Sequence, residues 1–294
     1  MNRPMIQLGR YRFLLNTDSK RYALVILFLL TLIITVTVLA LLWFGGYYSR
    51  GYTCSADERF SRDCVLTIAA DLELDTAQFT ECLEDRKFSE QITQFQSQAQ
   101  TIGIEEIPTV FFGTGNDRLT GFLVPGGLTT SRMSALLEEE FTELEDLQAY
   151  VLSGLSTDLD RLETSLLTLY TSPSGGGLSA EDARIKVREI TAPDRERLRQ
   201  AALLREYPLE TGPFVGQGAI TAVVFANYEC ARCREYMQTQ LPLLEYGARN
   251  GGFRYVFRDI VREPYENAGF LANAAHCAGD QGQFFSFHAR LFQQ

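Results

Sequence analysis

The sequence predicts an α/β fold, and three observations carry this prediction. A largely apolar run at residues 219–226 is typical of a strand buried on both faces, and Cys230 and Cys233 follow it at the expected start of a helix. Residues 253–257 alternate as a second strand, so the helix between the two strands forms a crossover and the strands are expected to be parallel. Residues 109–124 indicate two further strands around a turn rich in Gly and Asn.

The N-terminal part contains a predicted membrane span. Residues 22–44 are apolar and uncharged, and this run is long enough for a helix that crosses a lipid bilayer and too long for the core of a secretory signal. Basic residues cluster before the run, whereas only Arg50 follows it closely. The positive-inside rule therefore predicts a cytoplasmic segment at residues 1–21, a single transmembrane helix at residues 22–45 and an extracytoplasmic remainder. The alternative is a buried core helix.

Composition and cysteine usage exclude some classes of function. A net charge of −10 argues against nucleic acid as a partner, because phosphate binding needs a clustered excess of Lys and Arg. Outside the cytoplasm disulfides are stable, and six cysteines are available for pairing: Cys54, Cys64, Cys82, Cys230, Cys233 and Cys277. Zinc competes for the Cys-x-x-Cys pair, but a second ligand pair at metal-binding spacing is missing. We expect no metal and no cofactor, and the pairing of Cys54 and Cys64 stays open.

Helical spacing surrounds the predicted strands. Residues 64–83 indicate two short helices, the second capped by Asp75, and residues 89–102 indicate another that ends at Gly103. Residues 130–170 predict one long helix with an acidic, solvated face. A Ser- and Gly-rich linker follows, and then a charged helical segment that reaches Arg205.

Several stretches resemble a known family. FANYECARCREY, FRYVFRDIVREP and NAAHCAGDQGQFFSFHARLF are similar to the front half of DsbA-like thiol–disulfide oxidoreductases. IAADLELDTAQFTECLEDRKF and GIEEIPTVFFG are similar to the back half of the same fold. The resemblance implies a thioredoxin-like fold with an inserted helical subdomain. It implies a back-half segment at residues 52–141, a helical linker region at residues 142–211 and a front-half segment at residues 212–294.

The two halves stand in the opposite order from the family. A circular permutation would join them into one domain, because permutation at a surface loop is physically easy. A tandem of a degenerate domain and a truncated one is the second explanation, and pairing between two chains is the third. The resemblance also implies a structural disulfide between Cys82 and Cys277, which would favour a single composite domain. Alternatively, both cysteines are small buried apolar residues.

The resemblance assigns a redox role to Cys230 and Cys233 and a substrate-binding role to the loop around Pro108. In the family the corresponding proline is cis, with Ile107 and Thr109 beside it here. From spacing alone, Pro108 equally begins an edge strand.

The residues around Cys230 suggest how its reactivity is set. As the first and more exposed cysteine of the pair, Cys230 is expected to be held as a thiolate by helix N–H groups, with Arg232 adding positive charge. Glu229 would raise the thiol pKa or shuttle a proton. The dipeptide Ala231-Arg232 departs from the Pro-His-like pattern common in the family. His276 and His288 are expected to be structural.

The predicted function is that of a membrane-anchored, extracytoplasmic thiol–disulfide oxidoreductase that forms or exchanges disulfides in exported proteins. Its partners would be reduced exported polypeptides and a membrane protein that reoxidises or reduces the cysteine pair. A reductase or isomerase on the same scaffold is one alternative. A binding or chaperone-like module with purely structural cysteines is the other.

Overall fold

The computed structural model describes residues 5–8, 11–14, 54–55, 58–139 and 141–294, and the chain divides into two units, Met1–Tyr52 and Thr53–Gln294. In the first unit, β1 (Met5–Leu8) and β2 (Tyr11–Leu14) form an antiparallel hairpin. The predicted transmembrane helix at residues 22–45 lies outside the described residues, as does most of the predicted segment 1–21. None of the helices that the structure describes has both the length and the apolar character needed to cross a membrane.

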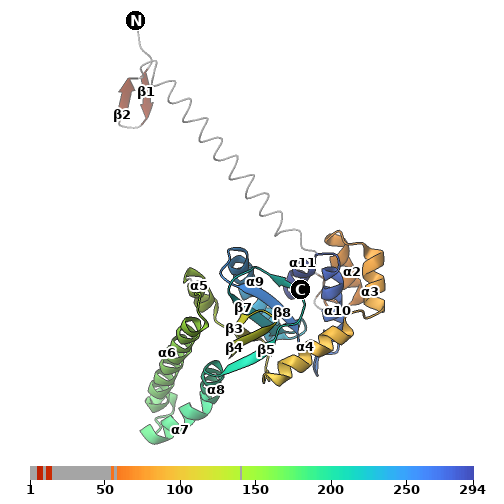
Figure 1. The fold of residues 1–294 in the computed structure, drawn as a ribbon. Coiled ribbons are helices and arrows are strands. Elements are labelled where there is room, and N and C mark those ends of the chain that lie inside the picture. The colour runs from red at the N-terminus through yellow and green to blue at the C-terminus, as the bar shows by residue number, and fades with distance from the viewer. Residues whose placement is uncertain (1–4, 9–10, 15–53, 56–57, 140) are drawn as a thin grey trace. The chain divides into compact units, whose positions relative to one another are not determined.

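The second unit is built on a mixed sheet with the strand order β5-β4-β3-β7-β8-β6 (Figure 1). Its strands are β3 (Thr109–Gly115), β4 (Arg118–Pro125), β5 (Leu204–Pro208), β6 (Phe214–Val215), β7 (Ile220–Ala226) and β8 (Arg254–Asp259). The predicted parallel pair is present, because β7 and β8 run parallel and helix α9 (Ala231–Arg249) connects them. The other neighbouring pairs in this sheet are antiparallel.

The centre of this sheet joins distant parts of the chain. Strand β3 lies between β4 and β7, and Thr109 is the cross-strand partner of Phe225. All seven residues of β7 are buried, as the largely apolar run of residues 219–226 predicts for a central strand. The predicted segments 52–141 and 212–294 therefore contribute neighbouring strands to one sheet.

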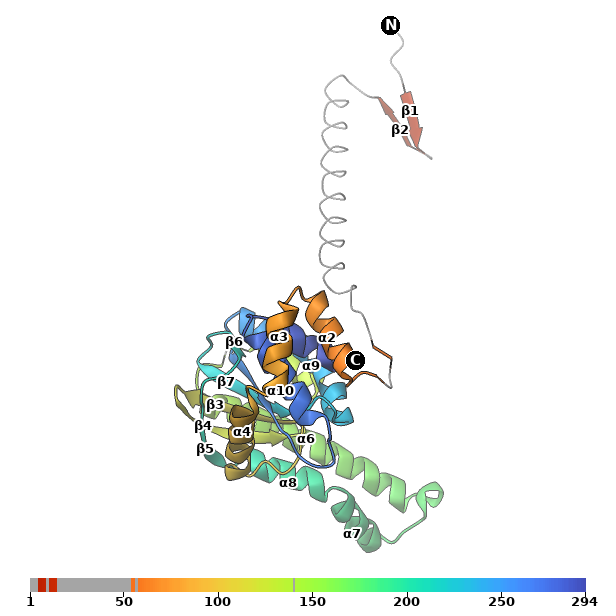
Figure 2. The same cartoon turned by 90° about the vertical axis from the view of Figure 1, so that its right-hand side faces the viewer.

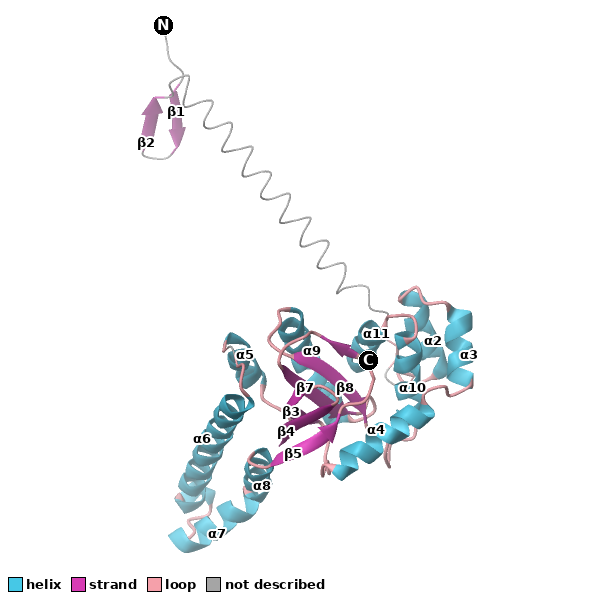
Figure 3. Cartoon of the chain, viewed as in Figure 1, coloured by secondary structure: helices cyan, strands magenta, loops and turns pink. Residues whose placement is uncertain are grey.

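Helices from both segments also pack together on one side of the sheet (Figure 3). They are α2 (Arg62–Asp71), α3 (Thr76–Glu84), α4 (Ser89–Thr101), α10 (Ala268–Gly279) and α11 (Phe284–Gln293). Asp75 caps α3 as predicted, since its carboxylate accepts hydrogen bonds from the backbone of Ala77 and Gln78. These helices form a helical subdomain assembled from residues on both sides of the linker region.

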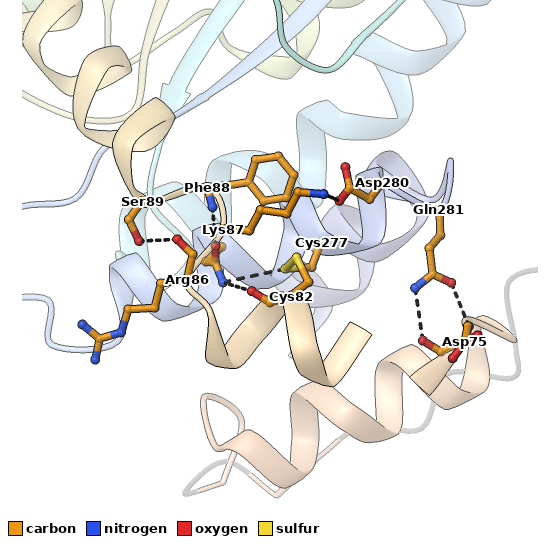
Figure 4. Close-up of a disulfide and its surroundings, with 10 residues drawn as sticks. Asp75, Cys82, Arg86, Lys87, Phe88, Ser89, Cys277, Asp280 and Gln281 are labelled. Atoms are coloured by element: carbon orange, nitrogen blue, oxygen red, sulfur yellow. Dashed lines mark hydrogen bonds and ion pairs between the residues drawn. A yellow bond between two sulfur atoms is a disulfide. The ribbon is translucent and has the colours of Figure 1, made fainter. Parts of the chain in front are cut away.

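A disulfide joins Cys82 of α3 to Cys277 of α10, the pairing that the family resemblance implied (Figure 4). Polar contacts surround it. The Asn273 side chain accepts a hydrogen bond from the backbone of Phe88 at 3.0 Å, and Gln281 exchanges two hydrogen bonds with the Asp75 backbone at 2.7 and 3.1 Å. A second disulfide pairs Cys54 with Cys64, a pairing that the sequence left open.

The region between the two segments differs from its prediction. The long helix expected at residues 130–170 is two helices, α5 (Thr130–Glu138) and α6 (Leu144–Thr171), and Glu139 is extended with ψ at 135°. The acidic run at this point explains the break, because negative side chains at the C-terminal end of a helix oppose its dipole. The prediction of one continuous helix was therefore wrong at this point.

The helical linker region contains a strand as well as helices. After the short 3₁₀ turn η1 (Pro173–Gly175) come α7 (Ala180–Ile190) and α8 (Ala192–Ala201), which with α6 lie on the side of the sheet away from α2 and α3 (Figure 2). The charged helix expected to reach Arg205 ends at Ala201, and β5 follows and pairs antiparallel with β4. Tyr207 of β5 is fully buried, so this stretch closes the edge of the sheet instead of remaining a linker.

Candidate active site

Cys230 occupies the N-cap of α9, directly after β7 ends. The turn between them is held by Asn227, whose side chain accepts a hydrogen bond from the Glu229 N–H at 2.8 Å and donates one to the carbonyl of Ile260 at 2.7 Å. The Cys230 N–H in turn bonds the Asn227 carbonyl at 3.3 Å. A strand that ends in an Asx turn thus delivers the first cysteine to the positive end of a helix.

The two sulfur atoms have opposite electrostatic environments. The hydrogen bond from the Cys233 thiol lowers the pKa of Cys230 to about 6, helped by the Cys233 N–H, the Tyr265 hydroxyl and the Arg232 N–H and opposed by burial. The Cys233 N–H lies 3.2 Å from the Cys230 sulfur. Burial, together with the neighbouring Cys230, raises the pKa of Cys233. At neutral pH the first sulfur is therefore mostly a thiolate, and the second remains a thiol.

The expected difference in exposure is small. Cys230 is 3% exposed and Cys233 is completely buried, so the pair lies beneath the side chains of neighbouring loops. The two sulfurs therefore differ in reactivity mainly because their pKa values differ, and less because their solvent exposure differs.

The side chains of Glu229 and Arg232, which flank the cysteine pair, bind neighbouring segments of the chain. The Glu229 carboxylate accepts hydrogen bonds from the backbone and side-chain nitrogens of Asn267 at 2.8 and 3.0 Å, which ties it to the start of α10. The Arg232 guanidinium is exposed and lies 3.9 Å from Glu106, and the residue acts on the Cys230 sulfur through its backbone N–H. The Arg234 guanidinium braces the turn by donating to the Glu229 carbonyl at 2.8 Å.

The proline loop reaches the same end of the sheet. The Ile107–Pro108 peptide is cis, and β3 begins at the next residue, Thr109. The Pro108 carbonyl accepts a hydrogen bond from Gly126 at 2.8 Å, and the Thr109 hydroxyl donates to the Glu106 carbonyl at 2.7 Å. Among the backbone hydrogen bonds of the described residues, none uses the Ile107 N–H or carbonyl. This leaves a free donor and acceptor beside the cysteine pair.

A third loop, at residues 260–267 between β8 and α10, completes the site. Arg262 donates to the carbonyl of Glu105 at 2.7 Å, which fastens this loop to the proline loop. The loop also carries Tyr265, which is one of the groups that lower the pKa of Cys230. No pattern in the sequence predicts this position, because a Tyr in a polar loop matches no spacing rule and only the folded loop brings it near Cys230.

The two histidines lie apart from this chemistry. His276 Nε2 is 3.0 Å from the buried carboxylate of Asp259. His288 lies between the hydroxyls of Tyr228 and Tyr255, at 3.0 and 3.1 Å, and burial lowers its pKa to about 3. In the part of the chain that the structure describes, no group of three or more His, Cys, Asp or Glu side chains is arranged to hold a metal ion.

A β-α-β unit with a Cys-x-x-Cys pair at the helix start, next to a strand that follows a cis-proline, fits a thioredoxin-like fold. Residues 210–294 match the family model described as Thioredoxin, and this match supports a thioredoxin-superfamily domain. Comparison with curated proteins and with solved structures gives no match.

Proposed function

We propose that this chain is a DsbA-like thiol–disulfide oxidoreductase that forms disulfides in exported proteins. One observation carries the proposal: Cys230 caps α9 with a pKa lowered to about 6, while the pKa of its buried partner Cys233 is raised. A stabilised thiolate at the first sulfur favours the reduced form of the pair, and this makes the disulfide form an oxidant.

The reaction is a pair of thiol–disulfide exchanges. A substrate thiolate attacks Cys230 in the Cys230–Cys233 disulfide, which forms a bond from the substrate sulfur to Cys230 and releases Cys233, which takes up a proton. A second substrate thiolate then attacks the substrate sulfur of this mixed disulfide and releases Cys230 as a thiolate. The substrate dithiol loses two electrons and becomes a disulfide, and the enzyme disulfide is reduced to the Cys230–Cys233 dithiol.

The fold supports the proposal that the two halves of a DsbA-like domain are circularly permuted here. Strand β3, which carries the proline loop, pairs with β7, which carries the cysteines, although the proline loop comes first in the chain. The Cys82–Cys277 disulfide links the halves a second time. A single composite domain accounts for both contacts within one chain, whereas a tandem of incomplete domains accounts for neither.

Substrate binding is proposed at the proline loop. An extended segment of a reduced polypeptide would pair with the free N–H and carbonyl of Ile107, next to Pro108 and Thr109, and place its cysteine at Cys230. We further propose that residues 22–44 anchor the domain to the outer face of a membrane, where a membrane redox protein reoxidises the pair.

The test is oxidation of a reduced two-cysteine peptide by the oxidised full-length chain. We expect stoichiometric peptide oxidation by the wild type and loss of this activity in both Cys230→Ser and Cys233→Ser, because neither variant can form the Cys230–Cys233 disulfide that takes up the two electrons. The exposed Tyr246→Phe serves as a matched control. Unchanged activity in Cys230→Ser would sink the proposal, and peptide binding without oxidation would favour a binding module.

A further inference from the structure

The turn that follows β4 is bonded to the proline loop. It consists of Gly126 and Gly127, and both have a positive φ, at 75° and 68°. The Gly126 N–H donates to the Pro108 carbonyl at 2.8 Å, and the Gly127 N–H donates to the Val124 carbonyl at 2.9 Å. Through the Gly126 bond, the position of this turn sets the position of the proline loop.

Arg197 of α8, in the linker region, binds the same turn. Its Nη2 donates a hydrogen bond to the Gly127 carbonyl, and a Cβ atom added to Gly126 would lie 3.8 Å from its guanidinium carbon. The Nε of Arg197 is buried and has no hydrogen-bond partner among the described residues. A buried guanidinium nitrogen without a partner costs free energy of folding, so stability alone is a weak reason for a charge at this position.

Tyr236 contacts the turn from the helix that carries the cysteines. A Cβ atom added to Gly127 would lie 2.4 Å from the Tyr236 ring, so the ring packs directly on the backbone of the turn. Tyr236 belongs to α9, which begins directly after its N-cap Cys230. The Gly126–Gly127 turn therefore touches both α8 and α9, and its position relates the proline loop to the cysteine pair.

We propose, resting on the function proposed above, that Arg197 is a positioning residue that holds the proline loop in place for substrate binding. Its hydrogen bond fixes the Gly126–Gly127 turn, and the turn holds the Pro108 carbonyl. A polypeptide that pairs with the neighbouring Ile107 backbone is thereby placed with its cysteine at Cys230. The linker region, which separates the two halves in the chain, thus supplies a residue on which substrate binding depends.

The experiment compares Arg197→Met with the wild-type full-length chain on two substrates. Met keeps an unbranched side chain but removes the hydrogen-bond donor. The oxidised variant should oxidise the reduced two-cysteine peptide about tenfold more slowly, because it lacks a hydrogen bond from a charged group. Dithiothreitol is too small to pair with the proline loop, so it should react at the wild-type rate. The midpoint of Cys230 alkylation should also stay unchanged, whereas a general disturbance of the site would move all three quantities.

Two further variants complete the comparison. Arg197→Lys keeps a charge and a donor on a shorter side chain, so it should lose less of the peptide rate than Arg197→Met. Arg199→Met is the matched control, because Arg199 is an exposed residue of the same helix whose guanidinium binds Glu196 of that helix. It should change neither the peptide rate nor the dithiothreitol rate.

A second measurement follows the turn directly and needs no redox activity. In hydrogen-exchange NMR, the Gly126 N–H should exchange about tenfold faster in Arg197→Met than in the wild type, because its bond to the Pro108 carbonyl opens more often. A wild-type peptide rate, an equal loss of peptide and dithiothreitol oxidation, or unchanged Gly126 exchange in folded Arg197→Met would overturn the role of Arg197. If Arg197→Met does not fold, Arg197→Lys carries the same tests. Failure of the proposed function appears separately, as absent peptide oxidation by the wild type, and the exchange measurement then decides whether Arg197 holds the loop.

Discussion

The reactivity of Cys230 depends on its neighbour Cys233, and this dependence gives a quantitative prediction. The hydrogen bond from the Cys233 thiol is the largest cause that lowers the pKa of Cys230 from 9.0 to about 6. Cys233→Ala removes this donor, whereas Cys233→Ser keeps a hydroxyl at the same position. Because a hydrogen bond to a charged group contributes about 1.5–3 kcal/mol, the alanine variant should titrate at least about one pH unit higher than the serine variant.

The same shift sets a pH dependence for the redox equilibrium. At pH 7, a thiol with a pKa near 6 is about 90% ionised, and this ionisation stabilises the reduced form by about 1.4 kcal/mol compared with an ordinary cysteine, or about 30 mV for two electrons. The pKa is lowered in the folded protein, so the stabilisation is absent below pH 6, grows as the pH rises and is complete near pH 9.

The assay is the rate of alkylation of the reduced protein between pH 4 and pH 10, because only the thiolate reacts. The wild type should reach half of its maximal rate near pH 6. A wild-type midpoint near 9, or identical midpoints for Cys233→Ala and Cys233→Ser, would refute the assignment of Cys230 as a thiolate stabilised by Cys233.

Three further predictions concern the scaffold. Replacing Cys82 and Cys277 with Ala should lower the free energy of unfolding by up to about 5 kcal/mol in urea titrations, because the disulfide closes a loop with a sequence separation of 195. An unchanged urea midpoint would mean that the stability of the two halves does not depend on this disulfide. Burial lowers the pKa of His288 to about 3, so the stability that the neutral imidazole contributes is present above pH 6.5 and is lost as the pH falls toward 3. In thermal melts over this range, the wild type should lose up to about 5 kcal/mol more unfolding free energy than His288→Gln. Parallel pH profiles of the two proteins would contradict this. Asn227→Ala removes the bonds to Glu229 and Ile260 and should cost about 1–3 kcal/mol of stability, while a variant as stable as the wild type in urea would show that this turn does not need its side chain.

Hydrophobic patterns and residue types within short stretches of the sequence predicted the central strands and one helix cap. The apolar run of β7 and the alternation of β8 show which strands are central and that a helix crosses between them. The cap at Asp75 follows from residue type and spacing alone. The pairing of Cys82 with Cys277 came from family resemblance, because the sequence does not say which cysteines meet across the fold.

The features that were missed depend on tertiary contacts. Strand β5 follows a charged helix and is only five residues long, so its pairing with β4 becomes favourable only once that edge of the sheet exists. Tyr265 lies near Cys230 because hydrogen bonds from Asn227 and Arg262 place its loop. Such contacts join residues far apart in the chain, where periodicity carries no information.

The pairing of β3 with β7 has a consequence for biosynthesis. The ribosome makes the proline loop and β3 well before it makes β7 and the cysteine pair, so one edge of β3 stays without its partner while the intervening helices emerge. Cys54 precedes Cys64 by only ten residues, whereas Cys82 has no disulfide partner until Cys277 is made, 195 residues later. A chain whose synthesis has not reached β7 therefore contains the proline loop without Cys230 and Cys233, and the candidate site cannot assemble until α9 has been made.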